Sequence, residues 1–179
     1  MGKTLAMTTK TGGLAVGLAV GAIMIMAPVA QAQQATELGT FNAWTAWRAT
    51  DASGVICYVS ATPQKSEPAG ANRDPIHFMI IHRKGMGTKN EVQTIIGYPY
   101  NTTNAGASAS VDGRSYPMVT EGSAAWLAST GDESGFVTAF KAGSSLVIKG
   151  TSQRGTNTTD TYSLSGATAA VNAIDAACK

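Results

Sequence analysis

The sequence predicts a mainly β domain, an antiparallel β-sandwich or partly closed barrel with short helices and a C-terminal helix tethered by a disulfide. Three observations predict it. Several segments alternate apolar and polar side chains with a period of two and are rich in β-branched residues, as strands are. The clearest helical spacing comes at the end of the chain, in residues 167–178. Of the only two cysteines, Cys57 lies in one of the predicted strands and Cys178 lies at the end of the predicted helix.

The start of the chain has the three regions of a secretory signal peptide. Lys3 and Lys10 give a positive beginning, residues 14–29 form an apolar run, and residues 30–32 (Ala-Gln-Ala) are a small-x-small cleavage triplet. The alternative, a membrane anchor, needs about 20 apolar residues. This run is shorter, contains Pro28 and turns polar directly after its end. We therefore expect export and cleavage after Ala32.

Cleavage divides the chain into a signal peptide, residues 1–32, and a single β domain, residues 33–179. The chain has 13 basic and 11 acidic side chains, and the two surplus lysines belong to the signal peptide. The remaining domain is near neutral and has no block of like charge, which argues against nucleic acid or an anionic membrane surface as a partner. We expect a periplasmic protein, with outer-membrane association or secretion as alternatives, and no membrane segment after cleavage.

Export places Cys57 and Cys178 in an oxidising compartment, where an isolated pair usually forms a disulfide. Closing a loop of this length stabilises a fold by on the order of 5 kcal/mol in the loop-entropy model. The alternative is two separate buried thiols. A zinc site is disfavoured, because the sequence has no C-x-x-C motif and neither histidine flanks a cysteine.

Taken in order, the first strands are expected at residues 41–48, 55–59, 76–82 and 91–96. Residues 76–82 are largely apolar on both faces, so this strand belongs in the middle of the sheet. Residues 85–89 connect it to the following strand as a hairpin loop. Residues 62–74 and 101–107 have the composition of surface loops.

The later strands form two pairs. Asp112-Gly113 is a tight-turn signal between short strands around Val111 and residues 116–118. Residues 146–151 and 158–164 form the second pair, joined through a turn that contains a glycine.

Two segments have helical character. Residues 123–141 have helical composition but are interrupted by Gly131 and Gly135, so we expect two short helices. Residues 167–178 are the stronger case, and Ser165 is a candidate to cap their start.

The two cysteines are expected to face the interior. Cys178 shares a helical face with Val171 and Ile174, and Cys57 shares a strand face with Val59. A bond between the two sulfur atoms would therefore pin the last helix onto the sheet.

His77 and His82 are the only histidines of the chain. Because they are an odd number of residues apart on one strand, they face opposite sides and cannot form a joint metal site. Either one alone could act as a base, but the sequence contains neither G-x-S-x-G nor H-E-x-x-H. We expect no catalytic residue, no metal site and no cofactor.

Six acidic residues are candidates for the carboxylate pair of a glycoside hydrolase: Glu91, Asp112, Glu121, Asp132, Glu133 and Asp160. Their spacing in the sequence does not single out any two of them as a catalytic pair. Asp132 and Glu133 are expected as first-turn acids of a helix, a stabilising position, and Asp112 is expected as a turn residue.

Trp44 and Trp47 are three apart on a predicted strand, so one should face inward and the other outward. Trp126 sits among Ala and Leu and is expected in the core. An outward tryptophan could stack on a sugar or a partner protein, with packing at a sheet edge as the alternative. Arg114 and the turn at residues 154–156 are exposed cations that could contact a partner or simply be solvated.

The most specific motifs lie in the C-terminal third, at residues 150–156 (GTSQRGT), 160–166 (DTYSLSG) and 174–178 (IDAAC). Shorter motifs earlier in the chain follow in the expected order: Trp44, Cys57-Tyr58 and residues 90–92, 97–99, 111–113 and 121–126. This pattern resembles the invasion-associated locus B family of alphaproteobacterial secreted proteins and covers nearly the whole mature chain. The resemblance implies an all-β sandwich whose two family cysteines match Cys57 and Cys178. It supplies no catalytic residue. One departure is Ala167, where the family leads us to expect an aromatic, which suggests a looser start to the last helix.

These observations favour a non-enzymatic protein that binds another envelope component, either an envelope protein or a glycan. The family resemblance adds a link to the entry of pathogenic bacteria into host cells, which would require exposure on the cell surface. The alternative is an envelope hydrolase acting on glycan or peptide. Such an enzyme would need two carboxylates, or a histidine and a serine, in one cleft.

Overall fold

The computed structural model describes residues 34–179, so the predicted signal peptide and its cleavage site lie outside the described residues. The strands, in chain order, are β1 (Thr36–Phe41), β2 (Trp44–Asp51), β3 (Gly54–Ala61), β4 (Lys65–Glu67), β5 (His77–Arg83), β6 (Thr88–Ile95), β7 (Ser108–Val111), β8 (Arg114–Glu121), β9 (Ala124–Leu127), β10 (Ser145–Thr151) and β11 (Asn157–Ser163). The helices are α1 (Glu133–Ala142) and α2 (Ala167–Ala177), with 3-10 turns at Lys84–Met86 and Thr130–Asp132.

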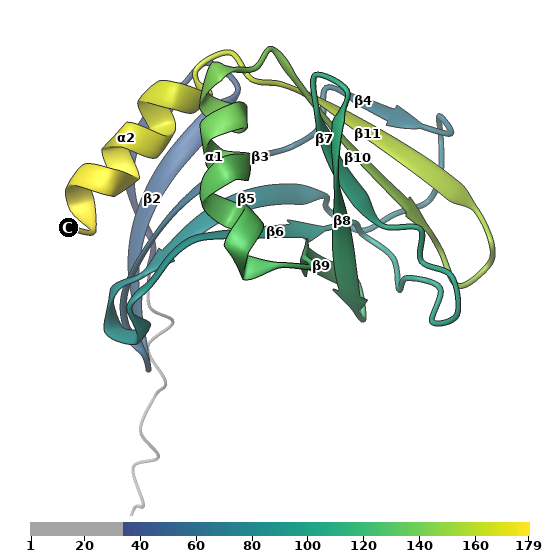
Figure 1. Cartoon of the computed structure of the whole chain (residues 1–179), viewed down its shortest axis with the longest axis horizontal. Coiled ribbons are helices and arrows are strands. Elements are labelled where there is room, and N and C mark those ends of the chain that lie inside the picture. The colour runs from purple at the N-terminus through teal and green to yellow at the C-terminus, as the bar shows by residue number, and fades with distance from the viewer. Residues whose placement is uncertain (1–33) are drawn as a thin grey trace, which may run out of the picture. The chain divides into compact units, whose positions relative to one another are not determined.

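The strands pair antiparallel in the order β1-β2-β3-β5-β6-β9-β8-β7-β10-β11-β4. β8 pairs with β9 on one side and with β7 on the other, and the sheet bends there into two layers. We call β1, β2, β3, β5, β6, β9 and β8 sheet A, and β7, β10, β11 and β4 sheet B. Helix α2 packs against β1, β2 and β3, and α1 packs against β6 and β7 (Figure 1). The predicted mainly β, antiparallel fold is confirmed.

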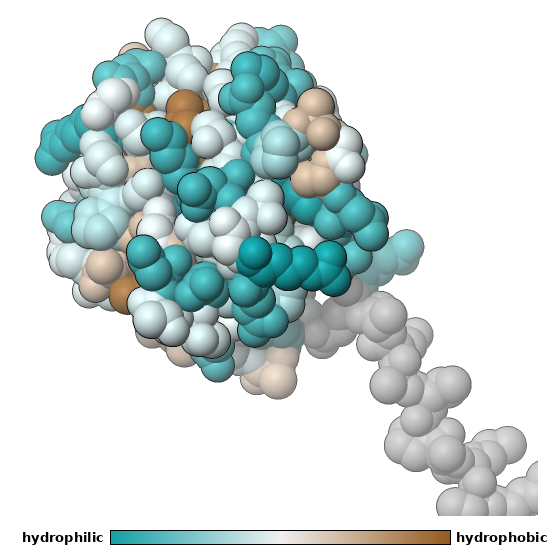
Figure 2. All heavy atoms as spheres, turned by 90° about the vertical axis from the view of Figure 1, so that its right-hand side faces the viewer, coloured by the Kyte–Doolittle hydropathy of each residue, from teal (hydrophilic) through white to brown (hydrophobic). Residues whose placement is uncertain are grey.

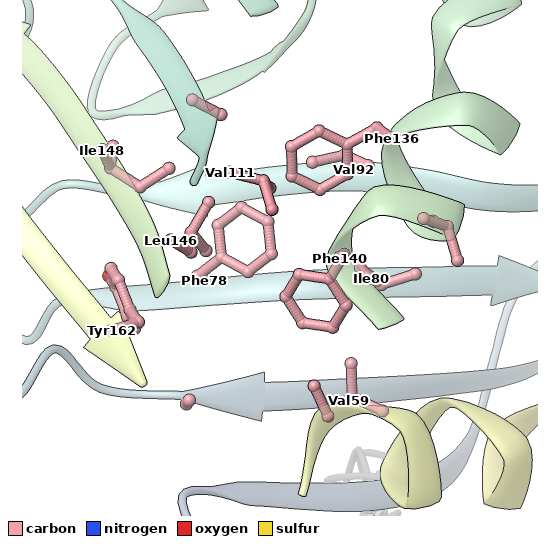
Figure 3. Close-up of a cluster of buried hydrophobic side chains, with 14 of the residues drawn as sticks. Val59, Phe78, Ile80, Val92, Val111, Phe136, Phe140, Leu146, Ile148 and Tyr162 are labelled. Carbon is pink, nitrogen blue, oxygen red and sulfur yellow. The ribbon is translucent and has the colours of Figure 1, made fainter. Parts of the chain in front are cut away.

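The core lies between the two layers and beneath the helices, and aromatic rings fill its centre (Figure 3). Trp44 packs edge-on against Phe140 with ring centroids 4.8 Å apart, and Phe78 stacks on Phe140 at 5.8 Å. Phe136 and Tyr162 close the cluster from α1 and β11. Such pairs add about 0.5–1.5 kcal/mol each beyond the area they bury, so these rings tie both sheets and α1 together.

The disulfide between Cys57 and Cys178 is present, with the two Cα atoms 6.0 Å apart. Cys57 lies on the inner face of β3 and is fully buried, and Cys178 is the residue directly after α2. The predicted tethering of the C-terminal helix to the sheet is confirmed.

Local patterns located several elements correctly. β5 lies between β3 and β6, as expected for the strand with two apolar faces. The Asp112-Gly113 pair forms the turn between β7 and β8, with φ angles of 47° and 90° that suit a two-residue hairpin. Trp44 faces inward and Trp47 outward, as their spacing predicted.

Two predicted boundaries are wrong. Residues 41–48 are not one strand, because Asn42 has a φ of 53° and begins a turn between β1 and β2. Asparagine is one of the few residues that enter this left-handed region readily. Residues 62–74 are not entirely loop, because β4 pairs with β11 and extends sheet B by one strand.

The prediction of two helices over residues 123–141 is also wrong. The first part is strand β9, which pairs with β6 on one side and β8 on the other. Ladder bonds on both sides override the helical propensity of its alanines. Trp126 is therefore half-buried on the outward side of sheet A and not in the core. Gly135 lies within α1 and does not interrupt it.

The start of α2 differs from expectation in two ways. Ser165 does not cap the helix, because its hydroxyl accepts a hydrogen bond from the Asn42 side-chain amide at 2.9 Å and Gly166 occupies the N-cap with φ 90°. A Cβ atom at Gly166 would lie 1.9 Å from the carbonyl oxygen of Phe41, so glycine is required there. The helix does not begin loosely, since Ala167 is fully buried.

Candidate functional site

The two histidines face opposite sides of β5, as predicted, and His82 is held on both of its ring nitrogens. Its Nδ1 accepts a hydrogen bond from the backbone N–H of Asn90 at 3.1 Å, and its Nε2 lies 3.2 Å from Oδ1 of Asp175 on α2. Because Nδ1 is an acceptor, the proton of the neutral ring sits on Nε2 and is donated to Asp175. Neither nitrogen is free to act as a base, so the His82–Asp175 pair fastens α2 to the sheet.

Burial lowers the pKa of His82 below its ordinary value of 6.5, although the hydrogen bond and charge of Asp175 oppose this shift. Burial acts to raise the pKa of Asp175, but its contacts with Lys89 and His82 outweigh this and lower it. The Lys89 ammonium lies 2.9 Å from the same carboxylate. A neutral His82 facing an ionised Asp175 is therefore the stable state at neutral pH.

The predicted carboxylate candidates do not converge on one cleft. Asp112 accepts hydrogen bonds from the backbone N–H groups of Ser144 and Ser145, both at 2.9 Å. Glu91 receives two hydrogen bonds from Arg83, at 2.8 and 3.2 Å. These two acids join segments of the fold.

Three further acidic candidates belong to β8 and to the start of α1. Glu121 is exposed at the end of β8. Asp132 and Glu133 are the N-cap and first-turn residues of α1, as expected. Burial, and secondarily the charge of Glu91, raises the pKa of Glu133. Neither Glu91 nor Glu133 lines the grooves described next.

The sixth candidate, Asp160, forms a buried ion pair that the sequence did not reveal. Arg73 donates from Nη1 and Nη2 to its two carboxylate oxygens at 2.9 and 2.6 Å. The side chains of Arg73 and Asp160 are 6% and 0% exposed. The signal that could have located it is Asp160 itself, which shares the inward face of β11 with Thr158 and Tyr162 and so requires a buried cation.

Arg73 also fixes the loop between β4 and β5. Its Nε and Nη2 donate to the carbonyl oxygen of Ile96 at 3.0 and 2.6 Å, and its guanidinium lies 5.1 Å from the ring centroid of Tyr98. The N–H of Asp74 donates to the carbonyl of Gly97 at 2.9 Å. A Cβ atom at Gly97 would lie 2.3 Å from the carbonyl oxygen of Asp74, so the loop can approach this closely only at a glycine.

A groove of about 630 Å³ opens above this ion pair, between residues 68–74, residues 97–99 and the β10–β11 hairpin. We call it the Arg73 groove. Tyr98 and Thr158 line it and are joined by a hydrogen bond of 2.6 Å between their hydroxyl oxygens. A second hollow of about 460 Å³ lies on the other side of the same loop.

Three polar side chains of the Arg73 groove have no partner within residues 34–179. The side-chain amides of Asn72 and Gln153 and the guanidinium of Arg154 are exposed and make no hydrogen bond or ion pair to other residues of this part of the chain. The exposed Arg154 that the sequence indicated therefore belongs to the groove. Arg114 lies elsewhere, over the ring of Tyr116.

Residues 34–179 contain no group of three or more histidine, cysteine, aspartate or glutamate side chains placed to hold a metal ion. None of the helices in this part of the chain is both long and apolar enough to cross a membrane.

The family model described as Invasion associated locus B (IalB) protein matches residues 44–175. The chain belongs to this family. The match runs from Trp44 to Asp175 and so contains Arg73, Asp160 and His82, whereas Cys178 lies just beyond it. Comparisons with curated proteins and with solved structures give no match. Membership of the IalB family therefore rests on the sequence pattern, in agreement with the motifs noted above.

We expect Arg73→Ala to lower the free energy of unfolding by about 3–5 kcal/mol, because it leaves the Asp160 carboxylate buried without a partner. Urea denaturation followed by circular dichroism measures this change. The double variant Arg73→Met/Asp160→Leu should recover much of the loss, since apolar residues of similar size often replace a buried pair without penalty. Arg114→Ala is the matched exposed control, with an expected change within about 0.5 kcal/mol. A similarly small change in the free energy of unfolding for Arg73→Ala would contradict the structural role of the Arg73–Asp160 ion pair.

Stability should fall as the pH drops below 6.5, the ordinary pKa of histidine. Since the folded-state pKa of His82 is lowered, the unfolded chain binds a proton first, and each step down in pH then favours unfolding until the folded-state pKa is passed. Denaturation midpoints between about pH 7 and pH 5 measure this slope. The variant His82→Gln should reduce this dependence of stability on pH. The control His77→Gln, on the opposite face of β5, should leave the dependence unchanged. Equal slopes in all three proteins would refute the assignment.

Proposed function

We propose that this IalB-family chain is a non-enzymatic binding module of the bacterial cell envelope. The signal-peptide pattern of residues 1–32 supports export. The Cys57–Cys178 disulfide is consistent with an oxidising compartment, because such bonds persist there and are rare in reducing ones. Periplasmic residence, with outer-membrane association or secretion as variants, is the location that these two features support best.

The observation that carries the binding role is the contrast between engaged and unengaged polar groups. The candidate acid and base groups, such as His82, Asp112 and Asp160, are held by other parts of the protein. The exposed amides and guanidinium of the Arg73 groove have no such partners within residues 34–179. A groove whose loop is fixed by the Arg73–Asp160 pair and which carries free hydrogen-bonding groups favours recognition, because the backbone of that loop needs little ordering when a ligand binds.

The charge of the groove favours a polar ligand without a strong net charge. Asp160 neutralises Arg73, and Arg154 and Asp74 contribute one charge of each sign. Amide, hydroxyl and guanidinium groups can donate hydrogen bonds both to sugar hydroxyls and to peptide carbonyls. An envelope glycan or an extended segment of an envelope protein is therefore the proposed ligand class. The link to host-cell entry that the family name records belongs to this proposal only if the protein reaches the cell surface.

Groove binding is tested with the purified domain, residues 33–179, incubated with two probes: isolated peptidoglycan and solubilised envelope protein. Replacing Gln153 and Arg154 together by alanine should reduce retention on one probe by roughly 10-fold, because each lost hydrogen bond contributes about 0.5–1.5 kcal/mol. Lys149→Ala, on the outer face of sheet B, is the control and should be retained like the native domain. Equal retention of all three proteins on both probes would refute the groove as the binding site.

Export is tested by the intact mass of the protein purified from its native envelope, with and without reduction before alkylation. We expect a chain that begins at Gln33 and whose two cysteines are alkylated only after reduction. A full-length mass with freely alkylated cysteines would place the protein in a reducing compartment and remove the basis of the envelope proposal.

A further inference from the structure

Strand β11 has an open edge beyond the point where β4 ends. β4 contains three residues and β11 contains seven, so β4 covers only part of its neighbour (Figure 1). The last paired positions are Glu67 and Thr159. Pro68 follows, which has no backbone N–H to donate to a ladder, and the chain leaves the sheet there. The place beside Asn157, two residues further along β11, is therefore occupied by no strand of residues 34–179.

The backbone N–H and C=O of Asn157 point to this open edge. Its cross-strand partner Thr151 directs its own N–H and C=O away from β11, to Ala105 at 2.7 Å and Asn101 at 2.8 Å. In an antiparallel ladder, two opposite residues that do not bond to each other both direct their backbone groups outward. The N–H and C=O of Asn157 thus face the side on which β4 lies, and neither has a hydrogen-bond partner within residues 34–179.

The Arg73 groove lies next to this edge. Thr156 and Thr158, the chain neighbours of Asn157, line the groove, and so do residues 68–71 after the end of β4. Three of those four loop residues are alanine or glycine, which leaves the space beside β11 unfilled. The groove is therefore continuous with the gap in sheet B that the early end of β4 leaves.

The hairpin that carries the open edge is held in place by its own hydrogen bonds. The N–H of Ser152 donates to the carbonyl of Thr156 at 2.9 Å, and the N–H of Gly155 donates to the carbonyl of Ser152 at 2.8 Å. The side-chain oxygen of Asn157 accepts a hydrogen bond from the Thr151 hydroxyl at 2.9 Å. A ligand would meet a backbone that is already extended, which reduces the cost of ordering on binding.

An unpaired N–H and C=O on one strand residue match the backbone of an extended peptide. A peptide residue opposite Asn157 would donate its N–H to the Asn157 carbonyl and accept the Asn157 N–H, as paired residues do in an antiparallel ladder. The free side chains of Gln153 and Arg154 lie in the same groove and can donate to further carbonyls of the peptide. A glycan has hydroxyl groups but no alternating backbone donors and acceptors, so it matches this edge less well.

The neighbouring part of the sheet edge is protected against pairing with another sheet. β4 is short, carries the charged side chains Lys65 and Glu67, and is followed by Pro68. Short edge strands, charges and prolines are features that prevent edge-to-edge association. Figure 2 shows the side of the domain that carries β4 and β11, where hydrophilic side chains predominate. Because only the stretch at Asn157 is open, a single extended chain fits there better than the edge of a second sheet.

We propose that the Arg73 groove binds an extended peptide segment of another protein by strand addition to β11 at Asn157. This inference rests on the groove being the binding site proposed above, and it chooses between the two ligand classes named there. The bound segment would continue the line of β4 and extend sheet B. In strand addition the main-chain hydrogen bonds supply the affinity, and side-chain contacts supply the specificity. Gln153 and Arg154 would contribute the side-chain contacts.

A library of random peptides displayed on phage tests the proposal, with the purified domain, residues 33–179, as the target. The selected peptides should bind Asn157→Pro at least about 10-fold more weakly, because proline removes the N–H that the peptide accepts. Asn157→Ala keeps this N–H and loses only the side chain, so its loss of affinity should be much smaller. Lys149→Ala is the unchanged control. In the ligand, methylation of the one peptide nitrogen that pairs with the Asn157 carbonyl should weaken binding to a similar extent.

Far-ultraviolet circular dichroism verifies that Asn157→Pro is folded. If this variant unfolds, amide hydrogen exchange of the native domain decides. The N–H of Asn157 should exchange at least about 10-fold more slowly when a selected peptide is bound, and the amides of the β7–β8 turn should be unaffected. Peptides that bind native and Asn157→Pro domains equally, or that leave the Asn157 amide unprotected, would overturn the proposal.

A library without any binder would overturn it as well. In that case retention on peptidoglycan separates the two proposals. If the double replacement of Gln153 and Arg154 still reduces retention on peptidoglycan, the groove is a glycan site and strand addition alone is wrong. If it does not reduce retention on either probe, the groove itself is not the binding site.

Discussion

The end of this domain that carries the Arg73 groove depends on one buried ion pair. Arg73 joins three segments that are distant in sequence: its own loop, the carbonyl of Ile96 after β6, and Asp160 on β11. Removing two charges from water is unfavourable, and such pairs are retained where one arrangement must be specified. Here the guanidinium is bound on its edges and lies over the Tyr98 ring, and these contacts hold the loop against the sheet. The shape of the Arg73 groove is therefore set by electrostatics in the interior.

A second constraint is that the inner side of sheet A is apolar. The inner side is satisfied within the chain by α1, α2 and sheet B, and the His82–Asp175 contact holds α2 there through a polar bond. The outer side has no such cover among the described residues. That side mixes apolar side chains such as Trp47 and Trp126 with polar ones such as Gln93. The Arg73 groove is lined by residues 68–74, residues 97–99 and the β10–β11 hairpin, and by neither face of sheet A.

The features that could be predicted from the sequence are those whose signal is local. β5 is a run of mostly apolar residues, β6 alternates in burial near its end, and the Asp112-Gly113 turn needs only two residues. β9 was missed because four residues rich in alanine have no strand pattern of their own, and its partners on β6 and β8 define it. Arg73 was missed for a related reason. It lies in a loop without periodicity, and its role becomes visible only when folding places it beside Asp160.

The disulfide has a consequence for the covalent topology of the protein. It closes a ring whose ends are 121 residues apart, so β1, β2 and the first part of β3 form a short tail outside it. A protease that cuts any single loop of the ring leaves one covalent molecule. Tension applied between the two ends of the domain would pass along the tail, through the sulfur–sulfur bond and out at Lys179. The ring, with the Arg73 groove inside it, would bear none of that load.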